Sequence, residues 1–181
     1  MPAPYKVQSS GLELPFKVRD HIAVAWKDTI LIWGGRNDND TRRPEVVRYR
    51  EGQSGKWITK TTSGDYPPGQ CSFSVTGHVL NDKLYVLGFD GCYIVGAAFI
   101  HTLDLNSWTW TAMSPTGNQP EGYGIGMSSW IHNGRIFCFG GYPRDGDQAQ
   151  CNWLFCYNTT NNAWEWPDQE CGIKALAFYI L

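Results

Sequence analysis

The run TILIWGG at residues 29–35 recurs along the chain as KLYVLG at 83–88 and as RIFCFGG at 135–141. Equivalent glycines in these runs are spaced by 54 and 52 residues. A second apolar segment precedes each run across a two-residue polar turn. One of these turns is Asn133-Gly134, the strongest short hairpin signal because both positions tolerate a positive φ. The repetition therefore predicts three β-hairpins in phase.

Each hairpin is followed by signals for two further strands. Segments with an aromatic or aliphatic centre predict a third strand over residues 45–50, 99–105 and 153–157. A fourth strand is predicted around tryptophans one repeat apart, namely Trp57, Trp110 and Trp164 or Trp166. Each repeat is therefore predicted to form a four-stranded sheet.

The segments at 63–69 and 116–122 join one repeat to the next and are rich in Gly and Pro, so we expect strand pairing to end there. In both linkers a glycine stands seven residues after the fourth-strand Trp. We expect this spacing to fix the register of one repeat on the next.

A sheet of this kind has two apolar faces and cannot bury both alone. Stacking the sheets face to face around an axis buries them, which is the logic of a β-propeller. The predicted fold is all-β, with about three four-stranded antiparallel blades in an incomplete ring. The predicted segments are 1–18 as an N-terminal extension, 19–63, 64–117 and 118–172 as the three repeats, and 173–181 as an apolar tail, which we interpret as the end of a truncated or alternatively spliced product.

Structural roles are predicted for the glycines that end the apolar runs and for the fourth-strand tryptophans. A glycine near the crowded axis lets neighbouring backbone approach, and a large indole wedges one blade against the next. These residues are Gly34, Gly35, Trp57, Gly88, Trp110, Gly140, Gly141 and Trp164.

The composition excludes several classes of partner. The net charge is −2, from 15 basic and 17 acidic residues, and the charges form no blocks. This balance predicts neither a nucleic-acid partner nor an anionic membrane. The N-terminus lacks the apolar centre of a signal peptide, and no stretch approaches the roughly 18 apolar residues of a membrane span. We expect a cytoplasmic or nuclear location.

No cofactor or metal is predicted. The six cysteines lack zinc-ligand spacing, so buried free thiols are the preferred interpretation. The motif Gly122-x-Gly124-x-Gly126 leads into a strand and lacks the helix whose N-terminus would hold a phosphate. We interpret it as a flexible entry to the third blade.

An apolar run, a glycine pair and then a spaced Tyr and Trp resemble the kelch pattern. The first repeat carries Gly34-Gly35, Tyr49 and Trp57, and the third carries Gly140-Gly141, Tyr157 and Trp164. The second repeat departs from the pattern, with Gly88-Phe89 and with Leu103 at the Tyr position. The resemblance to kelch proteins covers about residues 19–172.

Among kelch proteins, the segments SGDYPP at 63–68 and WIHNGRIFCFGGY at 130–142 are similar to substrate receptors of cullin–RING ubiquitin ligases. That resemblance implies a six-bladed propeller whose top surface captures the C-terminal tail of a target through basic and aromatic residues after the glycine pairs. Arg36 and Tyr142 stand at the corresponding positions. It also implies a protein or peptide partner, with a cullin–RING ligase component among the partners of the full-length family.

The loops at 36–43 and 142–147 are the candidate binding segments, because a rigid propeller holds such loops in place. The candidate binding residues are Arg36, Arg42, Arg43, Tyr142 and Arg144. The alternative interpretation of these loops is a pair of solvated turns. We predict a non-enzymatic protein-interaction scaffold, whose specific form would be a substrate-recognition adaptor for ubiquitin ligation.

The alternative function is a copper-dependent oxidase similar to galactose oxidase. Such a site needs converging Tyr and His ligands and a Tyr–Cys crosslink. The four histidines fall on different predicted strands, and we interpret them as structural. They are His21, His78, His101 and His132.

Overall fold

The computed structural model describes residues 16–39, 41, 43–50, 56–67, 75–89, 98–120, 123–125, 127–140, 142–143 and 154–166. Strands are the only regular secondary structure within these ranges, as predicted. These ranges contain no helix long and apolar enough to cross a membrane.

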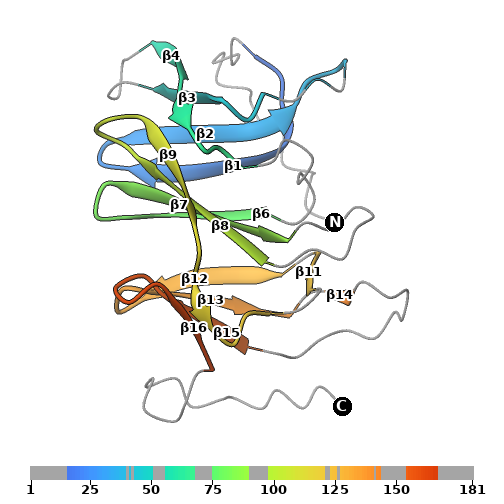
Figure 1. The fold of residues 1–181 in the computed structure, drawn as a ribbon. Helices are drawn as coiled ribbons and strands as arrows, with labels where there is room; N and C mark the ends of the chain where they lie inside the picture. The colour runs from blue at the N-terminus through green and yellow to red at the C-terminus, as the bar shows by residue number, and fades with distance from the viewer. Residues whose placement is uncertain are drawn as a thin grey trace, which may run out of the picture.

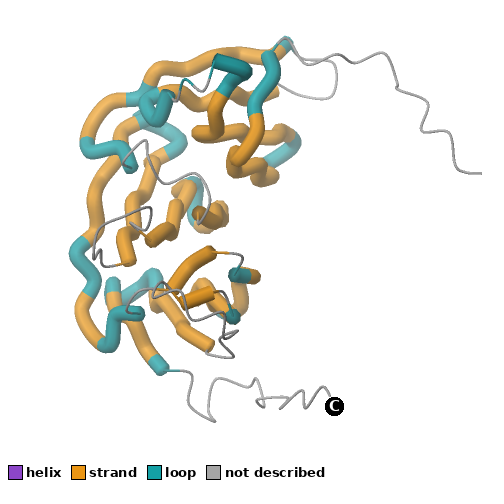
Figure 2. The backbone as a smooth tube through the Cα atoms, turned by 90° about the vertical axis from the view of Figure 1, so that its right-hand side faces the viewer, coloured by secondary structure: helices purple, strands orange, loops and turns teal. Residues whose placement is uncertain are grey.

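Three antiparallel sheets follow one another along the chain and stack as blades in an open arc (Figures 1 and 2). Blade 1 contains β1 (Arg19–Trp26), β2 (Thr29–Arg36), β3 (Val46–Arg50) and β4 (Trp57–Thr61). Blade 2 contains β6 (Val75–Leu80), β7 (Lys83–Phe89), β8 (Ala98–Asp104) and β9 (Thr109–Met113). Blade 3 contains β12 (Ser128–His132), β13 (Arg135–Phe139), β15 (Leu154–Asn158) and β16 (Ala163–Glu165). The predicted all-β fold of three four-stranded blades in an unclosed ring is confirmed.

Short strands connect the blades, and here the expectation that pairing ends in the linkers is wrong. Strand β5 (Ser63–Gly64) pairs in parallel with β9 of blade 2, and β10 (Thr116–Gly117) pairs in parallel with β16 of blade 3. Each linker therefore adds a fifth strand to the blade that follows it. Proline and glycine do not prevent this, because a parallel two-residue pair needs only a few backbone groups.

The glycine in each linker has a direct structural cause. Gly64 lies opposite Trp110 and Gly117 lies opposite Trp164, each with φ above +80°. A Cβ at Gly64 would lie 2.3 Å from the Trp110 carbonyl oxygen, and one at Gly117 would lie 2.2 Å from that of Trp164. Only glycine combines this close backbone approach with the left-handed conformation.

A second two-stranded pairing lies at the entry to blade 3. Strand β11 (Tyr123–Ile125) pairs with β14 (Tyr142–Pro143) in an antiparallel sheet. The segment interpreted as a flexible entry therefore includes a strand, which its glycines did not indicate.

The core consists of two layers between blades. Between blades 1 and 2, buried side chains include Leu31, Trp33, Leu84, Val86 and Trp110. Between blades 2 and 3, they include Leu87, Ile100, Ile136, Tyr157 and Trp164. Alternate residues of β7 face opposite layers, as the period of a strand requires. Blade 2 is thus apolar on both faces, and its burial depends on both neighbours.

The fourth-strand tryptophans all lie on the preceding side of their own blade, but their environments differ. Trp110 and Trp164 are buried, and the Trp110 ring lies 5.4 Å from that of Trp33 in blade 1. Trp57 is half-buried and meets Phe16 edge to face at 5.2 Å. The same sequence position thus has a blade on its preceding side in repeats 2 and 3, and Phe16 in repeat 1.

The alignment of Tyr49 with Tyr157 is wrong in register. Trp164 pairs with Tyr157, whereas Trp57 pairs with Arg50, so Arg50 is the structural counterpart of Tyr157. Tyr49 therefore points to the opposite face and stacks on Trp108 of blade 2 at 5.2 Å. In the sequence, Tyr49 stands eight residues before Trp57, whereas Tyr157 stands seven residues before Trp164. A shift of one residue turns a side chain to the opposite face of a strand.

Glycine is needed for a different reason at each of the two positions near the end of β2. Gly34 and Gly35 have φ of +70° and +78°. A Cβ on Gly35 would lie 2.8 Å from the Arg19 carbonyl oxygen, but one on Gly34 would have no neighbour within 4 Å. Backbone conformation, rather than crowding, therefore explains Gly34. Gly88 is buried at the end of β7, Gly140 has φ of +74°, and Gly141 lies outside the described residues.

Candidate binding face

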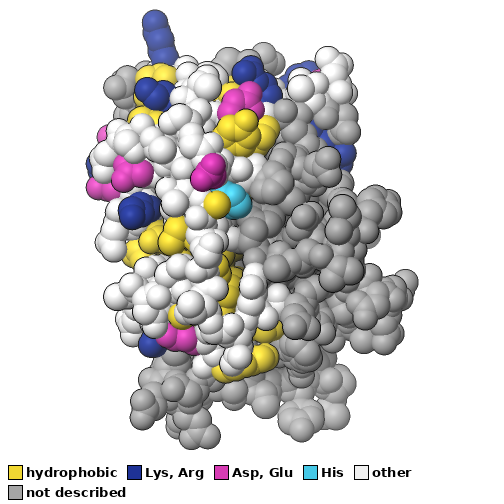
Figure 3. All heavy atoms as spheres, viewed as in Figure 1, with side chains coloured by type: hydrophobic (Ala, Val, Ile, Leu, Met, Phe, Trp, Pro, Cys, Tyr) yellow, Lys and Arg dark blue, Asp and Glu magenta, His cyan; other side chains and the backbone are white. Residues whose placement is uncertain are grey.

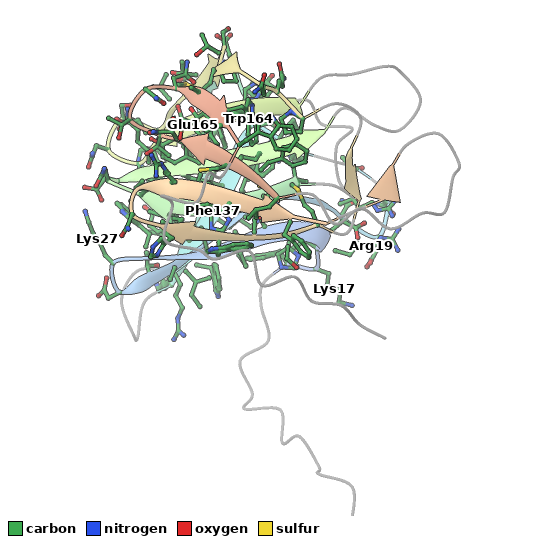
Figure 4. The ribbon with its side chains drawn as sticks, turned by 90° about the horizontal axis from the view of Figure 1, so that it is seen from below. Lys17, Arg19, Lys27, Phe137, Trp164 and Glu165 are labelled. Carbon is green, nitrogen blue, oxygen red and sulfur yellow. The ribbon has the colours of Figure 1, made fainter. Side chains whose placement is uncertain are left out.

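Strands β2, β7 and β13 all end on one side of the molecule, which we call the loop face (Figure 1). The hairpin turns after β1, β6 and β12 lie on the opposite side, the turn face. Figure 4 shows Lys17 and Arg19 on one side and Lys27 on the other. The candidate binding loops of the sequence begin on the loop face.

Arg36 ends β2 and is held in place by an ion pair. Its Nε donates a hydrogen bond to Asp20 Oδ2 over 2.7 Å, and both side chains are half-buried. Asp20 stands in β1 with a φ of +56°, in the left-handed region. Arg36 thus forms an ion pair with a carboxylate of its own blade. This ion pair helps to hold β1 against β2.

The loop after Arg36 is ordered around one side chain. Asn37 Oδ1 accepts hydrogen bonds from the backbone N–H groups of Asn39, at 3.1 Å, and Thr41, at 2.9 Å. The Asn37 N–H in turn donates to the Thr41 carbonyl over 3.2 Å. This arrangement gives the described part of the loop a defined shape, as Asx-type bonding commonly does.

Arg43 lies where the loop returns to β3 and is exposed. Its Nε donates to Glu45 Oε1 over 2.9 Å. Burial, and next the nearby charge of Arg43, lower the pKa of Arg48 from its ordinary value. The Arg48 guanidinium lies 4.7 Å from the centre of the Phe16 ring. Arg48 and Arg43 thus place two guanidinium groups near one another on blade 1.

Two basic residues that the sequence prediction missed join this group. Arg19 pairs with Arg36 in the β1–β2 register, and Lys17 precedes β1 with an exposed side chain. We call Lys17, Arg19, Arg36 and Arg43 the loop-face basic cluster. Asp20 accepts a hydrogen bond from Arg36 and Glu45 accepts one from Arg43. Most Lys and Arg side chains visible in Figure 3 lie in the upper part of the view, where Figure 1 places blade 1.

The remaining candidate residues are placed only in part. Tyr142 lies in β14, where its backbone pairs with Ile125 of β11. This places Tyr142 at the loop face of blade 3, on the same side of the molecule as Arg36 (Figure 1). Arg42 and Arg144 lie outside the described residues.

The histidines take separate positions in the blades. His78 Nε2 and Ser129 Oγ are 2.8 Å apart across the junction of blades 2 and 3, and Ser129 also hydrogen-bonds Thr76. Burial lowers the pKa of His78, and burial also lowers that of His101. Within the described ranges, no three His, Cys, Asp or Glu side chains cluster as metal ligands would.

Two of the six cysteines are described. Cys138 and Cys156 are buried thiols that form no disulfide, as expected from their spacing. Burial, with a smaller effect of Cys156, raises the pKa of Cys138 to about 12. The other four cysteines lie outside the described residues.

Comparison with known proteins assigns the three repeats to a family. The family model described as the KLHDC2/KLHL20/DRC7 Kelch-repeats domain matches residues 20–174. The chain belongs to this kelch-repeat family. Kelch domains of this kind are typically non-enzymatic modules that bind protein partners.

The kelch relatives are similar at a moderate level. The chain is 27% identical to Kelch domain-containing protein 3 of Bos taurus over 160 residues, covering 83% of the chain and 40% of the relative. It is 28% identical to Kelch domain-containing protein 1 of Mus musculus, with 80% and 36% covered. Host cell factor 1 of Rattus norvegicus is 27% identical, with 73% and 6% covered. The chain thus spans about two fifths of the length of the first of these relatives.

The fold has a counterpart among solved structures. The structure titled "Structure of YjhT" superposes with a TM-score of 0.64 at 14% identity, covering 86% of this chain and 52% of that one. At this identity the likeness supports the fold alone. The three kelch blades correspond to about half of that chain.

Proposed function

We propose that this kelch chain is a non-enzymatic protein-interaction module that recognises an acidic segment of a protein partner through the loop-face basic cluster. The more specific role that we propose is substrate recognition in ubiquitin ligation, acting in the cytoplasm or nucleus. The observation that carries the proposal is the position of four basic residues at the loop-face end of blade 1: Lys17 and Arg19 at the start of β1, Arg36 at the end of β2 and Arg43 just before β3.

The order of the cluster supports recognition rather than diffuse attraction. Arg36 is fixed by Asp20, and the adjoining loop is shaped by Asn37, so little side-chain and backbone freedom would be lost on binding at these points. The exposed guanidinium of Arg43 can donate paired hydrogen bonds to a carboxylate. A partner carboxylate could exchange with Glu45, which currently accepts from Arg43.

Affinity capture from cell extract tests the proposal. The test variant is Arg19→Glu with Arg43→Glu, which reverses two exposed charges and leaves the Arg36–Asp20 pair intact. The control is Lys56→Glu with Lys83→Glu, an equal charge change at exposed positions near the turn face. We expect the wild type and the control to recover the same partners, and the test variant to lose them.

Two readouts separate the general proposal from the specific one. Capture that weakens as salt rises supports an electrostatic interface. Recovery of a cullin–RING component with the wild type supports the role in ubiquitin ligation, and its absence from otherwise specific captures refutes that role alone. Equal recovery by both variants refutes the choice of the loop face.

A further inference from the structure

The first strands of the blades meet in different ways at the two internal junctions. Strand β6 of blade 2 contacts both β1 of blade 1 and β12 of blade 3. At the junction of blades 1 and 2, Ile22 packs so closely on Gly77 that a Cβ there would lie 2.5 Å from Ile22 Cγ2, and Val24 packs in the same apolar cluster. The same repeat positions at the junction of blades 2 and 3 are Thr76, His78 and Ser129. An apolar contact is thus replaced by a polar one.

The polar contact between blades 2 and 3 includes a group that titrates. His78 Nε2 lies 2.8 Å from Ser129 Oγ, which also hydrogen-bonds Thr76, and all three side chains are half-buried. A neutral imidazole can accept the Ser129 hydroxyl hydrogen at Nε2, whereas a protonated imidazole can only donate there. Protonation of His78 therefore brings a charge into the junction and fixes the direction of this hydrogen bond.

His78 has no carboxylate partner among the described residues. The described titratable and charged side chains on the faces that pack around it are Lys83, Tyr85 and Asp104 of blade 2 and Cys138 and Tyr157 of blade 3. On β12, this face carries Ser129 and Ile131, neither of which titrates, while His132 lies on the other face. Asp104 stands opposite Lys83 at the turn end of the sheet, where its Oδ1 accepts backbone hydrogen bonds from its own turn.

The surroundings of His78 do not offset a positive charge. Burial raises the pKa of Tyr85, and it raises those of Cys138 and Tyr157 to about 12, so these three groups are uncharged near neutral pH. Lys83 is a cation and repels a second one. Burial accordingly lowers the pKa of His78. The packed junction thus favours the neutral ring.

The junction of blades 1 and 2 has further contacts at its turn end. Trp26 Nε1 donates to Asp82 Oδ1 over 2.7 Å, and Lys27 Nζ lies 3.5 Å from the same oxygen. The Trp108 ring stacks on Tyr49 at 5.2 Å and meets Trp26 edge to face at 6.2 Å. The corresponding residues at the junction of blades 2 and 3 are Leu80 for Trp26, Gly134 for Asp82 and Asn162 for Trp108. These residues carry neither an aromatic ring nor a carboxylate, so they cannot form the same contacts.

We propose that the junction between blades 2 and 3 is a pH-sensitive joint, which is closed while the His78 ring is neutral and opens locally when that ring is protonated. Opening lets the charged ring reach water, which the packed junction denies it. Blades 1 and 2 stay joined through the contacts of Trp26 and Trp108. His101 faces their junction, where burial lowers its pKa and the nearby charge of Asp65 opposes that effect.

The sign and size of the response follow from linkage. The ring has its ordinary pKa of about 6.5 in the open joint and a lower pKa in the closed one. The closed form is therefore fully favoured above about pH 6.5, and the open form gains as the pH falls through that value. Because one proton is coupled to opening, the ratio of open to closed joint should rise by up to about tenfold between pH 7.5 and 5.5.

Thiol labelling of the 181-residue chain measures this opening. Cys138 is 2% exposed and lies on the face of blade 3 that packs on blade 2. Cys156 is 0% exposed and pairs with Phe137, so it lies on the opposite face of the same blade and serves as an internal control. Reaction with dithiodipyridine, followed by peptide mass spectrometry, gives the rate at each cysteine, which is divided by the rate of free cysteine at the same pH.

We expect the normalised rate at Cys138 to rise by up to about tenfold from pH 7.5 to 5.5, while the rate at Cys156 stays constant. A rise at both cysteines would mean that blade 3 unfolds as a whole. No rise at Cys138 would mean that the junction does not open. Either result overturns the proposal.

Variants assign the response to His78. His78→Val with Ser129→Gly introduces the residue types that Val24 and Gly77 supply at the other junction, and it should leave the labelling of Cys138 independent of pH. His78→Gln keeps a hydrogen-bonding amide but cannot become charged, so it gives the same test if circular dichroism shows that the double variant has lost its strands. His101→Gln is the matched control and should keep the wild-type response. A response that persists without His78, or that disappears in the control, overturns the proposal.

Discussion

Trp110 and Trp164 stand at equivalent positions in blades 2 and 3. They differ in whether the linker residue offers the indole N–H a hydrogen-bond acceptor. Trp110 Nε1 donates to Thr62 Oγ1 over 2.9 Å, and Thr62 Oγ1 donates in turn to the Glu45 carbonyl over 2.8 Å. At the next junction Pro115 stands where Thr62 stands, and Trp164 Nε1 is buried without a hydrogen-bond partner among the described residues. A buried donor left unpaired costs about 1–3 kcal/mol.

Replacing the linker residue should therefore change stability in opposite directions at the two junctions. Thr62→Val keeps the shape but removes the acceptor, so we expect a loss of about 1–3 kcal/mol in the free energy of unfolding. Pro115→Thr offers Trp164 an acceptor, so we expect a gain of up to about 1 kcal/mol. Denaturant unfolding at neutral pH measures both. Equal effects of the two changes would contradict the assigned role of Thr62.

The buried histidine between blades 2 and 3 predicts a pH dependence. Burial lowers the pKa of His78, so the folded state favours the neutral ring while the unfolded chain titrates near its ordinary value of about 6.5. Stability should be complete above that value and fall as the pH drops through about 6.5 and then through the lower folded pKa. The lowered pKa of His101 acts in the same direction.

Unfolding measured from about pH 7.5 to 5.5 tests this, because most carboxyl groups stay ionised in that range. His78→Gln should reduce the slope of stability against pH and leave the share due to His101. A variant with the slope of the wild type would show that His78 does not carry the effect.

At the scale of elements, the linker strands decide how one blade is positioned on the next. Gly64→Ala adds a Cβ that would lie 2.3 Å from the Trp110 carbonyl oxygen, in a backbone that already disfavours a side chain. Gly134→Ala is a matched control, since Gly134 has a similar φ of +72° but open space around it. We expect about 1 kcal/mol of destabilisation for the control and clearly more for Gly64→Ala. Equal losses would mean that close approach at the linker costs nothing.

The sequence predicted the elements well, and the pairing between them less well. The three hairpins followed from apolar runs and polar turns, whose residues Lys27, Asn81, Asp82, Asn133 and Gly134 all have positive φ. The parallel linker strands were not predicted, because a two-residue pair leaves no periodicity in the sequence. The alignment of Tyr49 with Tyr157 failed because one residue of spacing reverses a strand face and a repeat pattern tolerates that change.

The candidate site was predicted only in part, for a similar reason. The sequence indicated Arg36 and Arg43 as candidates because they follow a glycine pair in a charged loop. Lys17 and Arg19 were missed, since only the β1–β2 register brings Arg19 beside Arg36. The ion pair from Arg36 to Asp20 was also invisible, as the two residues lie sixteen positions apart. Arg19 could therefore be assigned to the basic cluster only once the pairing of β1 with β2 was known.

At the scale of the whole molecule, blade 2 holds blades 1 and 3 together because its two apolar faces pack against both of them. Its junction with blade 1 holds Leu84 and Trp110, and its junction with blade 3 holds Leu87 and Ile100. Leu84→Ala should destabilise by about 2–5 kcal/mol, since the side chain is fully buried. Because each repeat is stabilised by its neighbours, the loss should broaden or split the unfolding transition, as calorimetry can show. A uniform shift without broadening would indicate that all three blades unfold as one unit.

Hydrogen exchange on the captured complex tests the central claim, that this kelch unit binds its partner with the loop face of blade 1. Amide protection should rise in peptides that cover residues 17–20 and 36–45. Peptides that cover the turns at 26–29, 81–83 and 133–135 should exchange as in the free protein. Protection confined to those turns would place the partner on the opposite face and contradict the account.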